Sequence, residues 1–449
     1  MTGPTPRVTV VGGGLAGCEA ALQLARLGVP VELVEMRPAR PTPAHDGDAL
    51  AQIVCSNSLK STAPGTASGL LKDELDLLGC RLLALARTCA VPAGSALAVD
   101  KALFSAAVAD ALAGEPLVTV SRRETTELTP RPDHLWLVAT GPLTSDDLVA
   151  ALGEITGRPG LHFFDAIAPT VTAESLDLDI LYRAARYGKG EDDYLNAPLD
   201  RAAYEALHAD LLAAEKAAVH DFDRAFLFDG CQPIEEIAAS GPQSMAFGPL
   251  RPVGLIDPRT GRRPHAVVQL RQENVEGTLY GLVGFQTRLK FPEQKRVFRR
   301  IPGLADAEFV RYGQLHRNFF LDTPRCCADD FSLVGRRDVF VAGQITGVEG
   351  YVESIASGLH TAWQAAARLA GVTLPALPAA SMLGALLHGF LFDTTTARLS
   401  PMNANFGIVP DLAEPVRGKR DRKLAKAARA RDALAAWRDE PPVGRLLGG

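Results

Sequence analysis

The chain has 449 residues and a formal net charge of −5, with 47% hydrophobic residues, which fits a globular protein with room for two or three domains. The first apolar run of the chain is the predicted strand Val8–Val11, with no Arg- or Lys-led apolar segment before it, and Gln364, Arg368 and two prolines interrupt the most apolar later region. We therefore expect no signal peptide, no membrane span and a cytoplasmic location. The seven cysteines include no CxxC pair and no cluster with zinc spacing, so thiols rather than disulfides, and no metal, are predicted.

Residues 7–37 predict a strand, a helix and a second strand. Val8–Val11 is a run of apolar or β-branched residues, as in a buried strand, and residues 18–28 repeat apolar residues at helical spacing. A second apolar run, Val31–Val34, ends on Glu35. This order is typical of a β-α-β unit that binds a dinucleotide.

The turn between the first strand and the helix carries glycines at the spacing of the dinucleotide fingerprint. It reads Gly12-Gly13-Gly14-Leu15-Ala16-Gly17. We expect Gly12 to make the sharp turn, because only glycine enters positive φ without penalty, and Gly14 to let a pyrophosphate approach the helix N-terminus. Gly17 should let the helix pack closely on the sheet, and Glu35 should accept hydrogen bonds from a ribose.

Further elements complete the first part of the chain. A helix is predicted at Gly69–Leu78 with Ser68 as its cap, and another at Asp100–Leu112. Leu117–Val120 predicts a strand, and Leu135–Val138 is expected to be its partner.

That last strand is followed by Ala139-Thr140-Gly141, a sequence that flavin and nicotinamide enzymes place beneath the cofactor. A capped helix is expected at Ser145–Leu152.

The pattern changes at about residue 161. A helix is expected at Asp200–Phe222, and strands at Ala266–Leu270 and Leu279–Val283. The section ends near Pro324. The predicted domains are therefore a first part of a nucleotide-binding domain at 1–160, an insertion at 161–324 and a second part at 325–449.

The nucleotide-binding domain resumes with a strand at Asp338–Gln344, which carries Gly343 at its tip, and a helix from about Val352 to Leu369. In FAD proteins the last strand of the domain ends beside the flavin, and the next helix points its N-terminus at the isoalloxazine ring. Together with the fingerprint, this favours FAD over NAD. The predicted fold is α/β, a doubly wound FAD-binding domain of glutathione-reductase type with an inserted α+β domain.

Two cysteines are candidates for chemistry. Pro233 suits the first turn of a helix, and Glu235 and Glu236 suit the positive end of its dipole, so Cys231 is expected just before a helix N-terminus, where a thiolate is stabilised. The same acidic residues oppose that effect, and a buried cysteine beside a turn is the alternative. Cys55 opens a polar loop near the expected cofactor, but taken alone it fits a structural role better.

Two basic blocks stand out. Residues 288–300 hold six basic residues against Glu293, and residues 417–438 hold nine against two aspartates. Either block alone fits a solvated helix face better. The presence of both in an otherwise acidic chain also leaves a polyanionic partner open.

Five segments carry a family resemblance: residues 12–17, Phe228–Glu236, Val283–Lys290, Glu293–Phe298 and Ala342–Tyr351. Together they resemble the TrmFO family of folate- and FAD-dependent tRNA (uracil-5-)-methyltransferases. The resemblance runs from near the N-terminus to the basic tail. The MnmG family, which modifies the wobble uridine, shares the nucleotide motifs, but its chains are longer and carry an extra C-terminal helical domain.

The resemblance implies a reaction and its site residues. Methylenetetrahydrofolate would deliver a methylene group to reduced FAD, NAD(P)H would regenerate the flavin, and C5 of the T-loop uridine of tRNA would be methylated. Cys231 would add to uracil C6, and Cys55, the second thiol, would act as the base at C5. The implied cofactor-binding residues are Gly12, Gly13, Gly14, Leu15, Ala16, Gly17, Glu35, Arg37, Thr140, Gly141, Gly343, Gln344, Glu349 and Gly350. The implied RNA-binding residues are Lys290, Lys295, Arg296, Arg299, Arg300, Lys419, Arg420 and Lys423.

Three other functions are considered. The first is an MnmG-like modification of the wobble uridine. The second is a flavin oxidoreductase of the disulfide-reductase type, which needs a CxxxxC pair near the fingerprint that this chain lacks. The third is a flavoprotein that binds tRNA and uses its thiols only as redox sensors.

Overall fold

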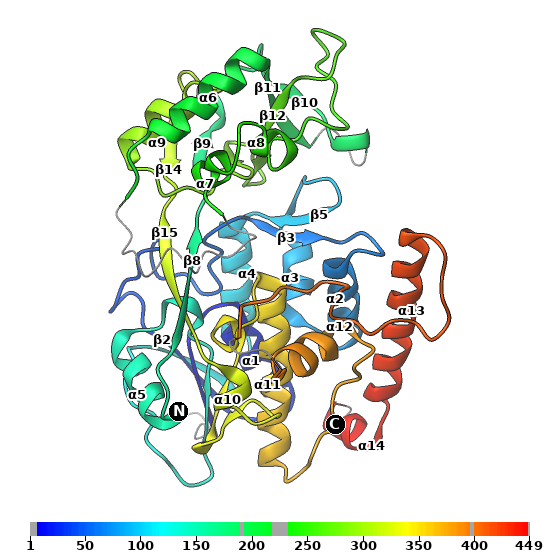
Figure 1. The fold of residues 1–449 in the computed structure, drawn as a ribbon. Helices are drawn as coiled ribbons and strands as arrows, with labels where there is room; N and C mark the ends of the chain where they lie inside the picture. The colour runs from blue at the N-terminus through cyan, green and yellow to red at the C-terminus, as the bar shows by residue number, and fades with distance from the viewer. Residues whose placement is uncertain (1–6, 189–192, 218–231, 396–398, 448–449) are drawn as a thin grey trace.

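The computed structural model describes residues 7–188, 193–217, 232–395 and 399–447. Figure 1 shows a lower lobe, which holds the N-terminal strands and the C-terminal helices, and an upper lobe formed by the middle of the chain. A two-stranded antiparallel ribbon, β8 (Leu161–Ala166) and β15 (Leu315–Phe320), runs between them.

The lower lobe is built on a six-stranded sheet in the order β16-β17-β7-β1-β2-β6. Its strands are β1 (Val8–Val11), β2 (Val31–Glu35), β6 (Val118–Arg122), β7 (Leu135–Val138), β16 (Ser332–Leu333) and β17 (Arg336–Val341). Only the β16–β17 pair is antiparallel. Every residue of β1 and β7 is buried, as is usual for central parallel strands that helices cover. The predicted doubly wound α/β fold is therefore confirmed.

The predicted pairing of the 117–120 strand with the 135–138 strand is wrong. β6 pairs in parallel with β2, whereas β7 pairs with β1 and β17. Parallel neighbours require a crossover connection, so adjacency in sequence does not decide which strands pair. The two strands of the β-α-β unit lie between β6 and β7.

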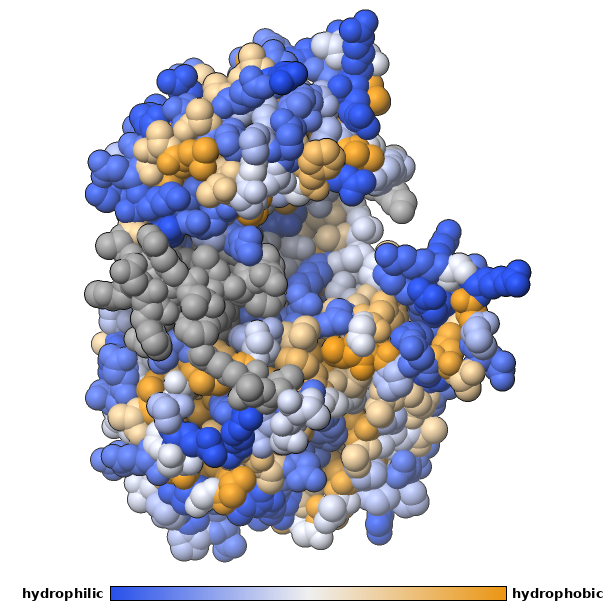
Figure 2. Space-filling model, viewed as in Figure 1, coloured by the Kyte–Doolittle hydropathy of each residue, from blue (hydrophilic) through white to orange (hydrophobic). Residues whose placement is uncertain are grey.

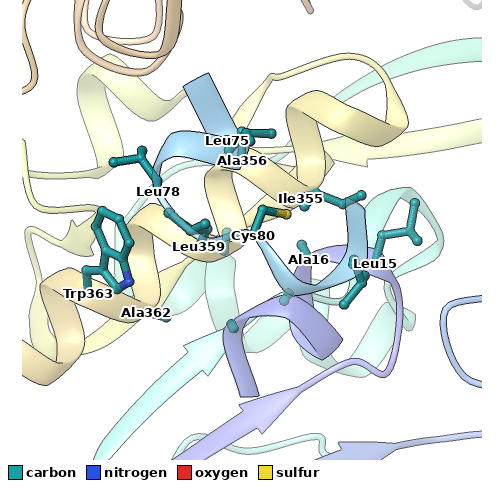
Figure 3. Close-up of a cluster of buried hydrophobic side chains, with 14 of the residues drawn as sticks. Leu15, Ala16, Leu75, Leu78, Cys80, Ile355, Ala356, Leu359, Ala362 and Trp363 are labelled. Atoms are coloured by element: carbon teal, nitrogen blue, oxygen red, sulfur yellow. The ribbon is translucent and has the colours of Figure 1, made fainter. Parts of the chain in front are cut away.

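Helices α1 (Leu15–Arg26) and α11 (Tyr351–Leu369) pack against each other beside this sheet. A Cβ atom on Gly358 would lie 2.3 Å from the carbonyl oxygen of Ala16, so glycine is required where the two helices touch. Figure 3 shows Leu15 and Ala16 beside Ile355, Ala356 and Leu359, together with side chains of the α2–α3 region. Because these side chains are buried, the core holds both helices against the nucleotide strand.

Three more helices cover the lower lobe: α2 (Ala67–Leu77), α3 (Arg81–Thr88) and α4 (Lys101–Ala113), while α5 (Asp146–Thr156) follows β7. The predicted Ser68 cap of α2 is wrong. Thr66 is the cap, and its Oγ accepts the Gly69 N–H at 3.1 Å, while the Ser68 hydroxyl donates to the Ser61 carbonyl. The small sheet β3 (Ser58–Ser61), β5 (Ala96–Val99) and β4 (Ala90–Val91) lies next to these helices and faces the upper lobe (Figure 1).

The C-terminal elements of the chain belong to the lower lobe. The short elements α10 (Thr323–Cys326) and α12 (Met382–Gly384), the latter followed by a π-helical turn at Ala385–Phe390, precede α13 (Lys419–Arg438) and α14 (Pro441–Leu447). The second basic block, residues 417–438, forms α13, and α14 is an additional helix. Ala430, Leu434 and Trp437 are buried against the core, which leaves the first turns of α13 to project from the lobe (Figure 1).

The upper lobe holds an antiparallel sheet in the order β10-β11-β12-β13-β9-β14. Its strands are β9 (Thr170–Thr172), β10 (Tyr182–Arg183), β11 (Tyr194–Leu199), β12 (Ala266–Gln272), β13 (Leu279–Leu282) and β14 (Phe309–Arg311). Its helices are α6 (Arg201–Ala213), α7 (Ile234–Ala239), α8 (Ser244–Phe247) and α9 (Phe291–Phe298). The helix predicted at 200–222 ends at Ala213, because the chain becomes extended at Ala214 and Lys216 forms a β-bridge with Leu289.

Candidate active site

The glycine-rich turn is shaped by close backbone contacts. Gly12 has a φ of +109°, and a Cβ atom there would lie 2.5 Å from the Ala139 carbonyl oxygen. A Cβ atom on Gly17 would lie 1.9 Å from the Gly12 carbonyl oxygen, so Gly17 is needed for the turn to close. A Cβ atom on Gly14 would meet no atom within 4 Å. Gly14 therefore faces open space at the N-terminus of α1, where the first N–H groups lack intrahelical acceptors and attract anions.

Glu35 ends β2 as a fixed carboxylate. It accepts the Gly13 N–H, the Arg37 N–H and the Arg37 Nε–H, each at 2.9 Å. Burial alone would raise the pKa of Glu35, but the hydrogen bonds and charge of Arg37 and the Gly13 N–H outweigh it, so the pKa is lowered. Arg37 also donates to Gln52 and to the Ala49 carbonyl. It thus holds residues 49–52 beside the Glu35 carboxylate.

An open cavity lies at the carboxyl ends of β1, β2 and β7, with about 1010 Å³ of empty space when the adjoining open solvent is included. Open α/β sheets bind ligands at this edge. Its lining includes most of the predicted cofactor-binding residues: Gly12, Gly14, Leu15, Ala16, Glu35, Arg37, Thr140, Gly141, Gly343 and Gln344. Gly13 and Gly17 lie in the same turn but do not line the cavity. Sequence reasoning missed Thr42, His45, Arg123 and Thr125 in the lining, although Arg123 and Thr125 follow the end of β6, where such residues gather.

A second open cavity adjoins the first, with about 1100 Å³ of empty space when open solvent is included. The two share Val54, Pro142, Leu143, Gln344 and Tyr351 in their linings. The second is also lined by Cys55, Glu349 and Gly350 of the lower lobe, and by Ile167, Gln286 and Asn318 from the ribbon and the upper lobe. Cys55 thus lies in the second cavity, between the first cavity and the upper lobe.

Cys55 is half-buried and tied to the start of α11. Its backbone N–H donates to the Tyr351 hydroxyl at 2.8 Å. Gly350 precedes Tyr351 with a φ of +120°, and Gln344 donates to Glu349 at 2.6 Å. The N-terminus of α11 therefore lies beside Cys55, in the position expected for the end of a helix that faces a flavin.

Cys231 lies outside the described residues. The helix predicted after it is α7, six residues long with Pro233 as its N-cap. Glu235 accepts the Thr287 hydroxyl and the Arg288 N–H, each at 2.8 Å, and burial raises its pKa. Glu236 pairs with Arg288. Contacts with Thr287 and Arg288, and not only the helix dipole, thus hold both acids and join α7 to the segment Val283–Lys290.

The first basic block is largely paired. Lys290 lies 2.7 Å from Glu215, Arg296 pairs with Glu293 and Asp210, and Arg300 lies 3.0 Å from Asp210. Arg299 donates to the Ala307 carbonyl, and Lys295 is exposed without an ion pair to any described residue.

The second basic block is more open. Lys419 and Arg420 are exposed at the start of α13, and the Lys423 Nζ lies 5.5 Å from the centre of the Phe406 ring. None of these three forms an ion pair within the part of the chain that the structure describes. The start of α13 is therefore the less neutralised of the two blocks. Figure 2 shows it as a hydrophilic projection at the right of the molecule.

A model of the family described as Glucose inhibited division protein A matches residues 7–373. A methylenetetrahydrofolate–tRNA-(uracil-5-)-methyltransferase TrmFO of Anaeromyxobacter dehalogenans (strain 2CP-1) is 55% identical over 440 residues, which is 97% of each chain. The chain belongs to the TrmFO family. The TrmFO of Desulforudis audaxviator is 51% identical and covers 97% of this chain and 99% of its own length.

The TrmFO fold has a solved relative. A crystal structure of Aquifex aeolicus GidA superimposes with a TM-score of 0.69 at 16% identity, covering 98% of this chain and 75% of that one. At this identity the match shows the fold alone. Within the described ranges, no group of three or more His, Cys, Asp or Glu side chains could hold a metal ion, and no helix is long and apolar enough to cross a membrane.

Proposed function

We propose that this chain methylates C5 of the T-loop uridine in tRNA, with methylenetetrahydrofolate as the carbon donor. The identity of 47% to 55% with curated TrmFO enzymes over nearly the whole chain carries this proposal. The adjoining cavities support it, because they join a dinucleotide site to a thiol at the boundary of the two lobes. Since tRNA is the substrate, we place the reaction in the cytoplasm.

The residues of the first cavity fit FAD. Gly14 leaves the α1 N-terminus open for a pyrophosphate, and Glu35 is an ionised acceptor for a ribose. Gln344 lines both cavities, and Glu349 lines the second. When bound and reduced by NAD(P)H, FAD would supply the methylene transfer and the hydride that completes the methyl group. The chain's own part is to hold the uracil and the thiols at the end of this site.

Uracil C5 is a weak nucleophile until a group adds at C6. A thiolate is suited to that addition, and we assign it to Cys231. The enolate that results would form a bond from C5 to the methylene carbon, and Cys55 then removes the C5 proton. Once hydride has completed the methyl group, the bond from sulfur to C6 breaks and the ring regains its C5–C6 double bond. The position of Cys55 in the second cavity, next to Tyr351 and Gly350, supports its part in this scheme.

The uridine must leave its loop to reach this cavity, and the polyanionic tRNA needs basic groups around the opening. The exposed residues Lys419, Arg420 and Lys295 are the candidates that carry no ion pair among the described residues. We assign tRNA backbone contacts to them and to Lys423. Lys290, Arg296, Arg299 and Arg300 would have to exchange present partners for phosphates.

Incubation of unmodified tRNA with the protein, methylenetetrahydrofolate and NADH tests the function. Mass spectrometry should find one added methyl group on the T-loop uridine. A modified wobble uridine would favour the MnmG-like alternative instead. Reduction of a disulfide substrate without any change to tRNA would favour a flavin oxidoreductase, and no turnover of either substrate would favour a redox sensor.

A further inference from the structure

The segment from Phe247 to Arg263 in the upper lobe combines exposed arginines with exposed apolar side chains. It holds four arginines, at 251, 259, 262 and 263, against a single acid, Asp257. Phe247 is 82% exposed and Ile256 is 57% exposed. A surface that mixes unpaired positive charge with an open aromatic face is typical of proteins that bind unpaired nucleic acid.

The guanidinium groups of three of the four arginines in this segment have no partner within the described part of the chain. Asp257 accepts three hydrogen bonds from Arg259 and so neutralises it. In contrast, no described residue forms an ion pair or a hydrogen bond with the guanidinium groups of Arg251, Arg262 and Arg263, and all three are exposed. Three cations therefore remain available to an anionic partner.

The segment is held in place by its own hydrogen bonds. The Asp257 N–H donates to the Arg262 carbonyl at 3.0 Å, and the Gly261 N–H returns to the Asp257 carbonyl at 2.8 Å. Arg186 donates to the Arg251 and Val253 carbonyls and, at 2.7 Å, to Gln269 in β12. Because the backbone is fixed to the sheet, little ordering is needed before these arginines can meet a ligand.

The segment lies where a long substrate can reach it. Figure 1 shows the loop before β12 and the start of α13 projecting on the same side of the molecule, one from each lobe. A tRNA whose uridine enters the cavity at the lobe boundary would extend over both lobes.

We propose that residues 247–263 form a second contact with tRNA, in addition to α13. Arg251, Arg262 and Arg263 bind backbone phosphates, and Phe247 stacks on an unpaired base. This inference rests on the proposed function for the identity of the RNA. The segment itself is outside every motif from which the family resemblance was drawn.

The test is the affinity of the full-length protein for unmodified tRNA at several salt concentrations. The double variant Arg262→Glu with Arg263→Glu should bind at least about tenfold more weakly at low salt, and its salt slope should fall by about two. Phe247→Ala should weaken binding by about fivefold or more with an unchanged slope, because stacking releases no counterions.

The matched control replaces two exposed arginines of other helices, Arg201 of α6 and Arg445 of α14, as Arg201→Glu with Arg445→Glu, for the same change in net charge. Equal affinity and slope for the test and control variants would overturn the proposal. So would a wild-type protein that self-associates, as seen by sedimentation, and that the Arg262/Arg263 variant renders monomeric, since the surface would then be a protein interface.

If the double reversal fails to bind FAD, the milder Arg262→Gln with Arg263→Gln variant replaces it, with an expected loss of slope of about two.

Failure of the function is separable from failure of the inference. Wild-type protein that binds tRNA through this segment but adds no methyl group contradicts the function alone, and methylation with unaffected binding by the variants contradicts the inference alone.

Discussion

Arg271 of the upper lobe donates its Nε–H to the side-chain oxygen of Asn57 in the lower lobe at 2.7 Å. Asn57 lies two residues after Cys55 in the sequence. The same guanidinium donates to the Ser56 hydroxyl, and the Asn57 amide donates to the Val99 and Gln272 carbonyls. The loop that carries Cys55 is therefore fastened to the sheet of the upper lobe.

We expect Arg271→Ala to lower the rate of tRNA methylation by about tenfold or more while FAD remains bound. The variant loses hydrogen bonds from a charged donor, worth about 2 kcal/mol, between the Cys55 loop and the upper lobe. Single-turnover rates and flavin absorbance measure the two effects. Arg183→Ala is the control, because Arg183 lies in the same sheet but donates to Tyr280. A rate equal to that of the control would contradict a positioning role.

Gly14→Ala and Gly17→Ala should fail in different ways. The new methyl group at position 14 meets no protein atom, so the fold should be kept, but the group occupies the space that a pyrophosphate needs and flavin should be lost. At position 17 it would collide with the Gly12 carbonyl, and the melting temperature of the protein itself should fall by several degrees. Flavin content and thermal unfolding of the flavin-free protein distinguish them. Equal melting temperatures for the two variants would refute this assignment.

Cys231→Ala should keep FAD and tRNA binding but lower methyl transfer by about a thousandfold or more, since the activating addition at C6 is lost. Cys55→Ala should still allow Cys231 to add to uracil C6, but it should prevent loss of the C5 proton and release of the base from Cys231. A covalent complex of protein and RNA should therefore accumulate. Denaturing gels of each variant with tRNA measure this. Normal turnover by Cys231→Ala would exclude the proposed chemistry.

Reversal of Lys419 and Arg420 to glutamate should weaken tRNA binding more than reversal of Lys290. The first pair has no acidic partner among the described residues, whereas Lys290 already pairs with Glu215. The salt slope should fall by about two for the pair and by less than one for Lys290→Glu. Filter binding over a salt series is the measurement, and the reverse order of effects would show that α13 is only a solvated helix.

Glu74 predicts a pH dependence of stability. Its two oxygens accept the Met382 and Leu383 N–H groups at 2.8 Å, but burial prevails and raises its pKa from 4.5 to about 7. Between these values the folded state keeps a proton that the unfolded chain has released, so this contribution to stability should fall as pH rises and then level off above about 7. The free energy of unfolding of wild type minus that of Glu74→Gln should show this fall. If the difference in unfolding free energy between wild type and Glu74→Gln rises between pH 4.5 and about 7, the Met382 and Leu383 N–H groups outweigh burial and lower the pKa of Glu74.

Local sequence was enough for the features that depend on neighbouring residues. The order of Val8–Val11, the glycines and Glu35 predicts the β-α-β unit, because strand, turn and helix each follow from side chains a few positions apart. The helix predicted at Asp100–Leu112 is α4, which begins after its N-cap Asp100. The family resemblance then identified the chemistry from short motifs.

Only the tertiary structure decided which distant segments meet. Strand β6 pairs with β2 because the crossover connections, and not the order along the chain, set the neighbours of a parallel strand. The contact of Cys55 with Tyr351 joins residues 296 positions apart, and Arg271 reaches Asn57 across the lobes. No pattern of spacing contains such contacts, since they arise from the packing of separate elements around a shared core.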